Sequence, residues 1–212
     1  MVFCSLDSGF LPSFVFEYVF FIFNLQVVFV FTPGQMVVYP AQGVGVIEKI
    51  ETQELAGVQA EFYIVHIICN NINVLVPVKN ATNAGLRPLS TMREAKQALD
   101  CLKNYQDTQV HAGQNWNRRQ REYTDRLKAG TLETVSSVLK ELILISSQKE
   151  LSFGEKRLLE QSMGLVTGEL SHVLEKQEEE IKETINSFYT ELFLPDETEE
   201  EPSQKKISGR KK

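Results

Sequence analysis

The hydrophobic pattern of this chain changes from strand-like to helix-like near residue 89. Between residues 36 and 78, short alternating apolar runs are separated by turns such as Asn70-Asn71, which predicts four or five strands in a small barrel or twisted sheet. From residue 89 on, apolar residues recur at helical spacing, and Thr91 with Glu94 and Ser152 with Glu155 fit capping boxes. The pattern predicts an α+β chain, with a small β-barrel module followed by a compact all-helical module of four or five helices.

The first 31 residues are strongly apolar and carry no positive charge. Nine of the thirteen Phe lie there, and the first Lys or Arg is Lys49. The 22-residue stretch 10–31 is long enough to span a bilayer, but it lacks the basic flank of a signal peptide or an anchored helix. Three interpretations stay open: a translation start near Val30, a membrane anchor, and a buried strand or helix.

The composition argues against several classes of function. The net charge of −6 means that any contact with nucleic acid must come from a local basic patch. The Cys and His residues are too scattered for a disulfide framework or a metal site, and the chain has no P-loop, GxGxxG, HExxH or GxSxG motif. We therefore expect no enzymatic activity, cofactor, metal or small-molecule substrate.

One segment, 116–157, is basic, with nine Lys or Arg against six acids. The segment 175–201 is the opposite, with two Lys against eleven acids, and the chain ends in a charged tail that we expect to be disordered. The single Trp, Trp116, opens the most basic helix and is followed by Arg118, Arg119 and Arg121. Two interpretations stay open: a ring that wedges into exposed base steps while Arg residues hold phosphates, and a core anchor beside a solvated face.

Residues 31–174 resemble the CarD family of bacterial transcription regulators that bind RNA polymerase. The resemblance is carried by four segments in order: FTPGQMVVYPAQGVGVIEKIET, INVLVPVKNATNAGLR, NWNRRQREYTDRLKAGTLETVSSVLKEL and LSFGEKRLLEQ. It implies a Tudor-like module, shared with transcription-repair coupling factor, that pairs a strand edge with the polymerase β subunit. It also implies a helical module that stabilises the open promoter complex. We expect an apolar extension over 1–30, the polymerase-binding module over 31–88, the DNA-binding module over 89–189 and the tail over 190–212.

The resemblance also implies site residues. Trp116 is the expected wedge at the upstream fork of the melted DNA, in the minor groove and with little sequence specificity. The expected DNA-backbone contacts are Arg118, Arg119, Arg121, Lys156 and Arg157. At the polymerase-facing positions where some relatives carry Arg, this chain has Gln53 and Leu75.

Without those two charges, backbone pairing and apolar packing become the expected source of affinity for polymerase. The expected location is the cytoplasm, on the nucleoid through polymerase. The alternative is a membrane-anchored or structural interaction protein without DNA contact.

Overall fold

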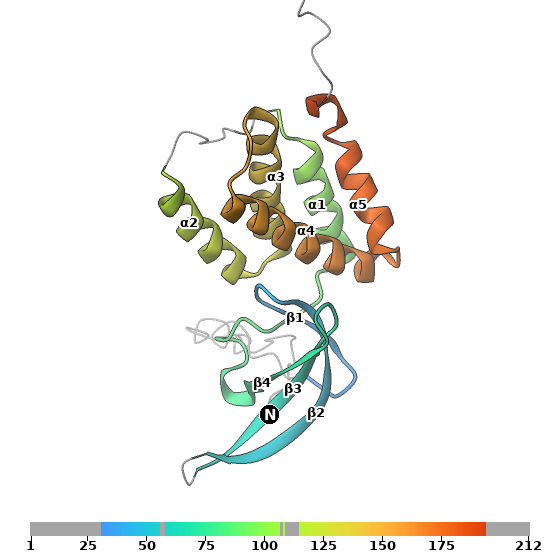
Figure 1. Ribbon diagram of the computed structural model, residues 1–212. Coiled ribbons are helices and arrows are strands. Elements are labelled where there is room, and N and C mark those ends of the chain that lie inside the picture. Colours follow the sequence, from blue (N-terminus) through green and yellow to red (C-terminus); the bar gives the residue numbers. More distant parts are fainter. Residues whose placement is uncertain (1–30, 56–57, 107, 109–114, 194–212) are drawn as a thin grey trace, which may run out of the picture.

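The computed structural model describes residues 31–55, 58–106, 108 and 115–193, and the sequence interpretations of residues 1–30 and 194–212 lie outside these ranges. A five-stranded antiparallel sheet comes first and a group of helices follows it (Figure 1). This arrangement confirms the predicted α+β class with a Tudor-like β module and a helical module. None of the helices in the described ranges has both the length and the apolar character that crossing a bilayer requires.

The sheet has the strand order β4-β3-β2-β1-β5. Its strands are β1 (Met36–Tyr39), β2 (Gly43–Leu55), β3 (Val58–Ile67), β4 (Ile72–Pro77) and β5 (Arg87–Pro88), with a 3₁₀ turn η2 (Val78–Asn80) after β4. The predicted turn between β3 and β4 is confirmed, because Asn71 adopts the left-handed conformation with φ of 55°. One face of the sheet forms a core with buried Phe31, Val37, Ile47, Tyr63, Val65, Ile67, Val76, Ala81 and Leu86.

The long strands β2 and β3 reach beyond the rest of the sheet (Figure 1). β1 pairs with β2 only as far as Val46, whereas β3 pairs with β2 out to Leu55. The outer half of β2 therefore has a strand neighbour on one side only. β4, at the end of the strand order, likewise has β3 as its one strand neighbour. Both strands offer backbone groups for pairing with another chain.

The helical module consists of α1 (Met92–Lys103), α2 (Trp116–Ala129), α3 (Leu132–Gln148), α4 (Phe153–Leu174), α5 (Glu178–Ser187) and a final 3₁₀ turn η3 (Thr190–Phe193). Both predicted capping boxes are confirmed, at the starts of α1 and α4. Gly130 ends α2 with φ of 71°, as a C-cap should. α3 packs against α1, α2 and α4. Its buried Val138, Leu139 and Leu142 belong to the core of the module.

A partly buried ion pair joins the two modules. Nη1 and Nη2 of Arg87, on β5, each lie 2.7 Å from a carboxylate oxygen of Glu169 on α4. Arg87 Nε also donates to the carbonyl of Gly130, at 2.7 Å. Glu169 further accepts hydrogen bonds from the backbone N–H and the hydroxyl of Ser90. These contacts tie the last strand of the sheet to α4 and to the turn between α2 and α3.

Candidate nucleic-acid and polymerase interfaces

Trp116 lies at the first position of α2 and is half-buried. The side chain of Asn115 caps the helix by accepting a hydrogen bond from the N–H of Asn117 at 2.9 Å. The indole packs against the edge of the helical core and rests on Gly154, where a Cβ atom would come within 2.7 Å of indole Cζ2. The ring is therefore anchored on the bundle, as the core interpretation expects, and it stays partly exposed, while the wedge into base steps stays a prediction.

Arg119 faces the inside of the module, unlike the phosphate contact that the sequence predicts. The residue is 3% exposed, and Nη2 donates to Glu155 Oε1 at 2.6 Å. Its guanidinium carbon also lies 5.6 Å from the centroid of the Trp116 ring. Residues three apart on a helix share a face, so Arg119 follows Trp116 toward the bundle. Its charge is neutralised by Glu155, and its position supports the indole from inside.

Glu155 is the centre of this buried network. It accepts hydrogen bonds from the backbone N–H and the hydroxyl of Ser152, at 2.9 and 2.8 Å, and from Lys149 Nζ at 3.1 Å. Burial raises the pKa of Glu155, but the hydrogen bonds from Ser152, Arg119 and Lys149 outweigh this effect and lower the pKa to about 2. One ionised carboxylate thus connects α2 with the start of α4 and fixes the surface on which Trp116 rests.

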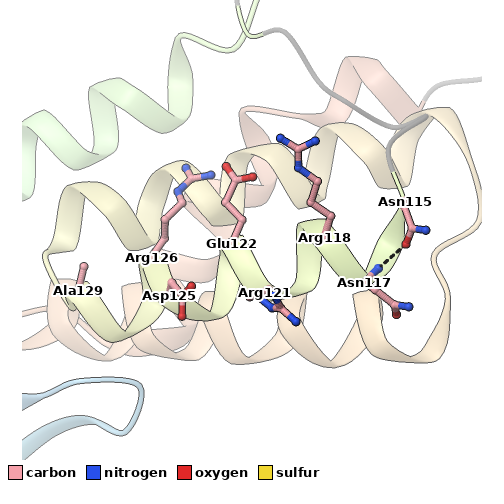
Figure 2. Close-up of a pocket in the computed structure, with 8 residues that line it drawn as sticks. All are labelled: Asn115, Asn117, Arg118, Arg121, Glu122, Asp125, Arg126 and Ala129. Carbon is pink, nitrogen blue, oxygen red and sulfur yellow. Dashed lines mark hydrogen bonds between the residues drawn. The ribbon is translucent and has the colours of Figure 1, made fainter.

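The outer face of α2 lines a shallow open depression (Figure 2). Arg118 and Arg121 are both exposed there, in the first half of the helix. Acidic side chains, Glu122 and Asp125, follow one turn later. Arg126 donates to Glu141 on α3 at 2.9 Å, which neutralises its charge. The cations of this face without a described ion pair, Arg118 and Arg121, therefore lie in the first half of the helix.

The start of α4 adds exposed positive charge to the same region. Lys156 and Arg157 are exposed in its first two turns, and Gly154, just before them, touches the Trp116 indole. Lys156 Nζ lies 3.1 Å from Glu150 Oε1, but both side chains are largely solvated, so this pair contributes little stability and leaves the lysine available. Trp116, Arg118 and Arg121 thus lie in the first two turns of α2, and Lys156 and Arg157 lie in the first two turns of α4, whereas Arg119 is directed inward.

Gln53 and Leu75 lie on the same face of the sheet. Leu75 on β4 is opposite Ile64 on β3, and Ile64 is opposite Lys49 on β2. Gln53 follows Lys49 at an even spacing along β2, and side chains two or four apart on a strand share a face. Leu75 is 47% exposed on the edge strand, whereas Gln53 is half-buried. Both belong to the two strands that have one open side.

Two family models match the chain in the order of its modules. The CarD-like/TRCF RID domain matches residues 31–90, and the CarD C-terminal domain matches residues 97–186. The chain belongs to the CarD family. The "Putative transcription factor YdeB" of Bacillus subtilis (strain 168) is 24% identical over 152 residues, which cover 72% of this chain and 97% of that protein.

As a CarD-family chain, it is a transcription regulator of the kind that interacts with RNA polymerase. The two matching family models thereby confirm the resemblance to the CarD family that the four sequence segments indicated. Within the described part of the chain, no three His, Cys, Asp or Glu side chains gather in a way that could hold a metal ion. His66 belongs to the β module, where its Nδ1 lies 2.7 Å from Asn73 Oδ1. It is therefore not part of the candidate site around Trp116.

The sequence interpretation missed three features of the site. It recognised Glu155 only as a capping residue and did not connect it with Arg119. It also missed the contact between Trp116 and Gly154, and the exposed Phe153 beside it. The helical spacing of Trp116, Arg119 and Tyr123, all on one face, could have indicated that Arg119 points inward, since Tyr123 is buried.

Proposed function

We propose that this CarD-family chain binds the RNA polymerase β subunit through its β module and stabilises the open promoter complex with Trp116 at the upstream fork. One observation carries the proposal. A half-buried indole, held by a buried Arg119–Glu155 pair, reaches the surface where two helix starts contribute exposed cations. Such a surface combines an aromatic ring for unstacked bases with charges for phosphates.

The polymerase contact is proposed for the open edges of the β module. An unpaired strand edge can add a strand from a partner through backbone hydrogen bonds. Leu75 and Ile72 on β4 are 47% and 42% exposed, so they offer apolar contacts beside that edge. Because Gln53 and Leu75 carry no charge, backbone pairing and apolar packing supply the affinity rather than ion pairs.

The DNA contact is proposed for the surface around Trp116. Once the chain is bound to polymerase, its contact with promoter DNA is effectively intramolecular, so a small surface is sufficient. Arg118, Arg121, Lys156 and Arg157 contact phosphates without reading sequence. The indole binds the unstacked fork better than the closed duplex, and a preference of about 1.4 kcal/mol shifts the ratio of open to closed complex about tenfold.

This function requires no catalysis, metal, cofactor or small-molecule substrate from the chain. It places the chain in the cytoplasm, on the nucleoid together with polymerase.

The test is the lifetime of open promoter complexes with the wild type and the Trp116→Ala variant. We expect the variant to lose the increase in lifetime and to keep its binding to polymerase in a pull-down, because the two contacts belong to different modules. Trp116→Phe should keep part of the increase, since a smaller ring still stacks. Equal lifetimes with wild type and Trp116→Ala would contradict the wedge and favour an interaction protein without DNA contact.

The polymerase contact has its own test. Leu75→Asp should reduce capture of polymerase, because a carboxylate on the edge strand disfavours apolar packing there. Met92→Asp is the matched control, since Met92 on α1 is 49% exposed and lies in the other module. If both variants capture polymerase as well as wild type does, the contact lies elsewhere.

A further inference from the structure

Phe153 is the most exposed of the large apolar residues in the described part of the chain. It is 83% exposed, ahead of Phe193 at 55%. A single apolar side chain on a surface is ordinary, so exposure alone points to no partner. The position of the Phe153 ring next to the candidate DNA-binding site is what points to a partner.

Phe153 precedes Gly154, the residue on which the Trp116 indole rests. A Cβ on Gly154 would come within 2.7 Å of indole Cζ2, so the backbone at the start of α4 is in direct contact with that ring. The two aromatic residues therefore lie at the same end of the helical module. They come from different helices, as the first residue of α4 and the first residue of α2.

The backbone that carries Phe153 is held by the same buried network as Trp116. Glu155 accepts the N–H of Ser152 at 2.9 Å, which fixes the first turn of α4 around Phe153. The same carboxylate accepts a hydrogen bond from Arg119, whose guanidinium lies over the Trp116 ring. Because one carboxylate fixes both helix starts, the spacing between the two residues is set before any partner binds.

The charges around Phe153 favour a polyanionic partner. Lys156 and Arg157 follow it by three and four residues, so they share its face of α4, and both are exposed. Arg118 and Arg121 lie on the neighbouring start of α2. An exposed aromatic ring among cations suits a nucleic acid strand with accessible bases, because the ring stacks on a base while the cations contact phosphates.

We propose that Phe153 is a second aromatic contact with promoter DNA, which binds the separated strands next to the step that Trp116 occupies. This proposal rests on the proposed function and extends it from one ring to two. The occupant is an unpaired DNA segment, since a closed duplex keeps its bases stacked and offers Phe153 only its backbone. With two rings on separate helix starts, the protein holds more of the melted region than a single wedge can.

The experiment uses the full chain and a fork-junction DNA with an unpaired segment. Trp116 is the only Trp, so quenching of its fluorescence measures binding directly. We expect Phe153→Ala to weaken fork binding about fivefold, the effect of losing roughly one stacking contact, and to leave duplex binding unchanged. Phe153→Tyr should bind like wild type, because it keeps the ring. Phe193→Ala is the matched control, an exposed Phe in η3 that should have no effect.

Open-complex lifetime and polymerase pull-down separate this inference from the proposed function. We expect Phe153→Ala to shorten the lifetime and to leave polymerase capture unchanged. If Trp116→Ala shortens the lifetime and Phe153→Ala does not, the inference is wrong and the proposed function stands. If neither variant shortens it, both fail. Loss of polymerase capture without DNA would assign Phe153 to a protein contact and overturn the inference. Because Phe153 is so exposed, its variants should melt like wild type, so unfolding would not mimic the effect.

Discussion

Arg87 and Glu169 form a two-pronged ion pair, with both nitrogen–oxygen distances at 2.7 Å, between the last strand of the β module and the long helix of the helical module. The Glu169 side chain is 4% exposed and the Arg87 side chain is 19% exposed, so the pair is only partly screened by water and salt. Arg87 and Glu169 are 82 residues apart along the chain. The ion pair therefore helps to fix how the proposed polymerase-binding sheet is oriented relative to the proposed DNA-binding surface, together with the hydrogen bond from Gln161 Nε2 to the Ala41 carbonyl.

Glu169→Ala should damage both stability and function. The variant leaves the Arg87 guanidinium without its carboxylate, and breaking such a pair lowers the free energy of unfolding by about 3–5 kcal/mol. We also expect shorter open-complex lifetimes with polymerase capture retained, because each module keeps its own surface. Urea denaturation and lifetime assays measure the two effects. The control is Glu180→Ala, which removes an exposed pair with Lys176 and should change stability by less than about 0.5 kcal/mol. Unchanged stability in Glu169→Ala would show that the ion pair does not stabilise the packing of the two modules.

Gly154→Ala should displace the indole. Its Cβ would lie 2.7 Å from indole Cζ2, closer than packed carbon atoms approach, so the ring or the helix has to move. We expect a loss of roughly 1–3 kcal/mol in the free energy of unfolding, together with shorter open-complex lifetimes.

Gly164→Ala is the matched control in the same helix. An added Cβ there meets nothing within 4 Å, so the substitution should raise stability by about 0.5–1 kcal/mol and leave the lifetime unchanged. If the two variants behave alike, contact with Trp116 is not what constrains Gly154.

Acid should lower the stability of the folded chain over a defined pH range, through the protonation of Glu155. The pKa of this carboxyl is lowered to about 2 in the folded chain from the ordinary 4.5, so the unfolded state binds more protons between these values. Its contribution to stability is therefore present above pH 4.5 and is lost as the pH falls toward 2.

Glu155→Gln tests this assignment, because the uncharged amide leaves Arg119 buried without a counter-charge. At pH 7 the variant should be less stable than wild type by roughly 3 kcal/mol. The difference should shrink as the pH falls through the window, and denaturant midpoints at several pH values would measure it. A difference that stays constant with pH would contradict the role of the Glu155 charge.

The three Arg residues that follow Trp116 should separate into two classes. Arg118 and Arg121 are exposed, so the double variant Arg118→Ala with Arg121→Ala should bind fork DNA more weakly, above all at low salt. The slope of log affinity against log salt should decrease by roughly 1.5–2, which corresponds to two lost phosphate contacts. Arg93→Ala with Lys103→Ala removes two exposed cations from α1 instead and should leave the slope unchanged.

Arg119→Gln belongs to the other class. Because Arg119 is buried against Glu155, the substitution should lower the free energy of unfolding by about 3 kcal/mol and change the salt slope little. Thermal melting and the salt titration would measure these two effects. A large change of slope without a loss of stability would restore Arg119 as a phosphate contact.

Patterns in the local sequence were sufficient to predict the order of the β module and the helical module. Alternation of apolar residues with period two and then with helical spacing predicted the α+β order, because each periodicity is set by backbone geometry within a few residues. Capping at Thr91 and Ser152 and the turn at Asn70-Asn71 are likewise short-range, and all of them are confirmed. The four family segments rest on the same kind of linear information.

What the tertiary structure decided is the direction in which identical side chains point and the partners they find. Arg118 and Arg119 are neighbours of the same type, yet one is exposed and the other buried, because one step along a helix rotates a side chain by about 100° and only packing says which side is inside. The partners Glu155 and Glu169 lie 36 and 82 residues away from their arginines. No local pattern links such distant residues, since the folded core brings them together.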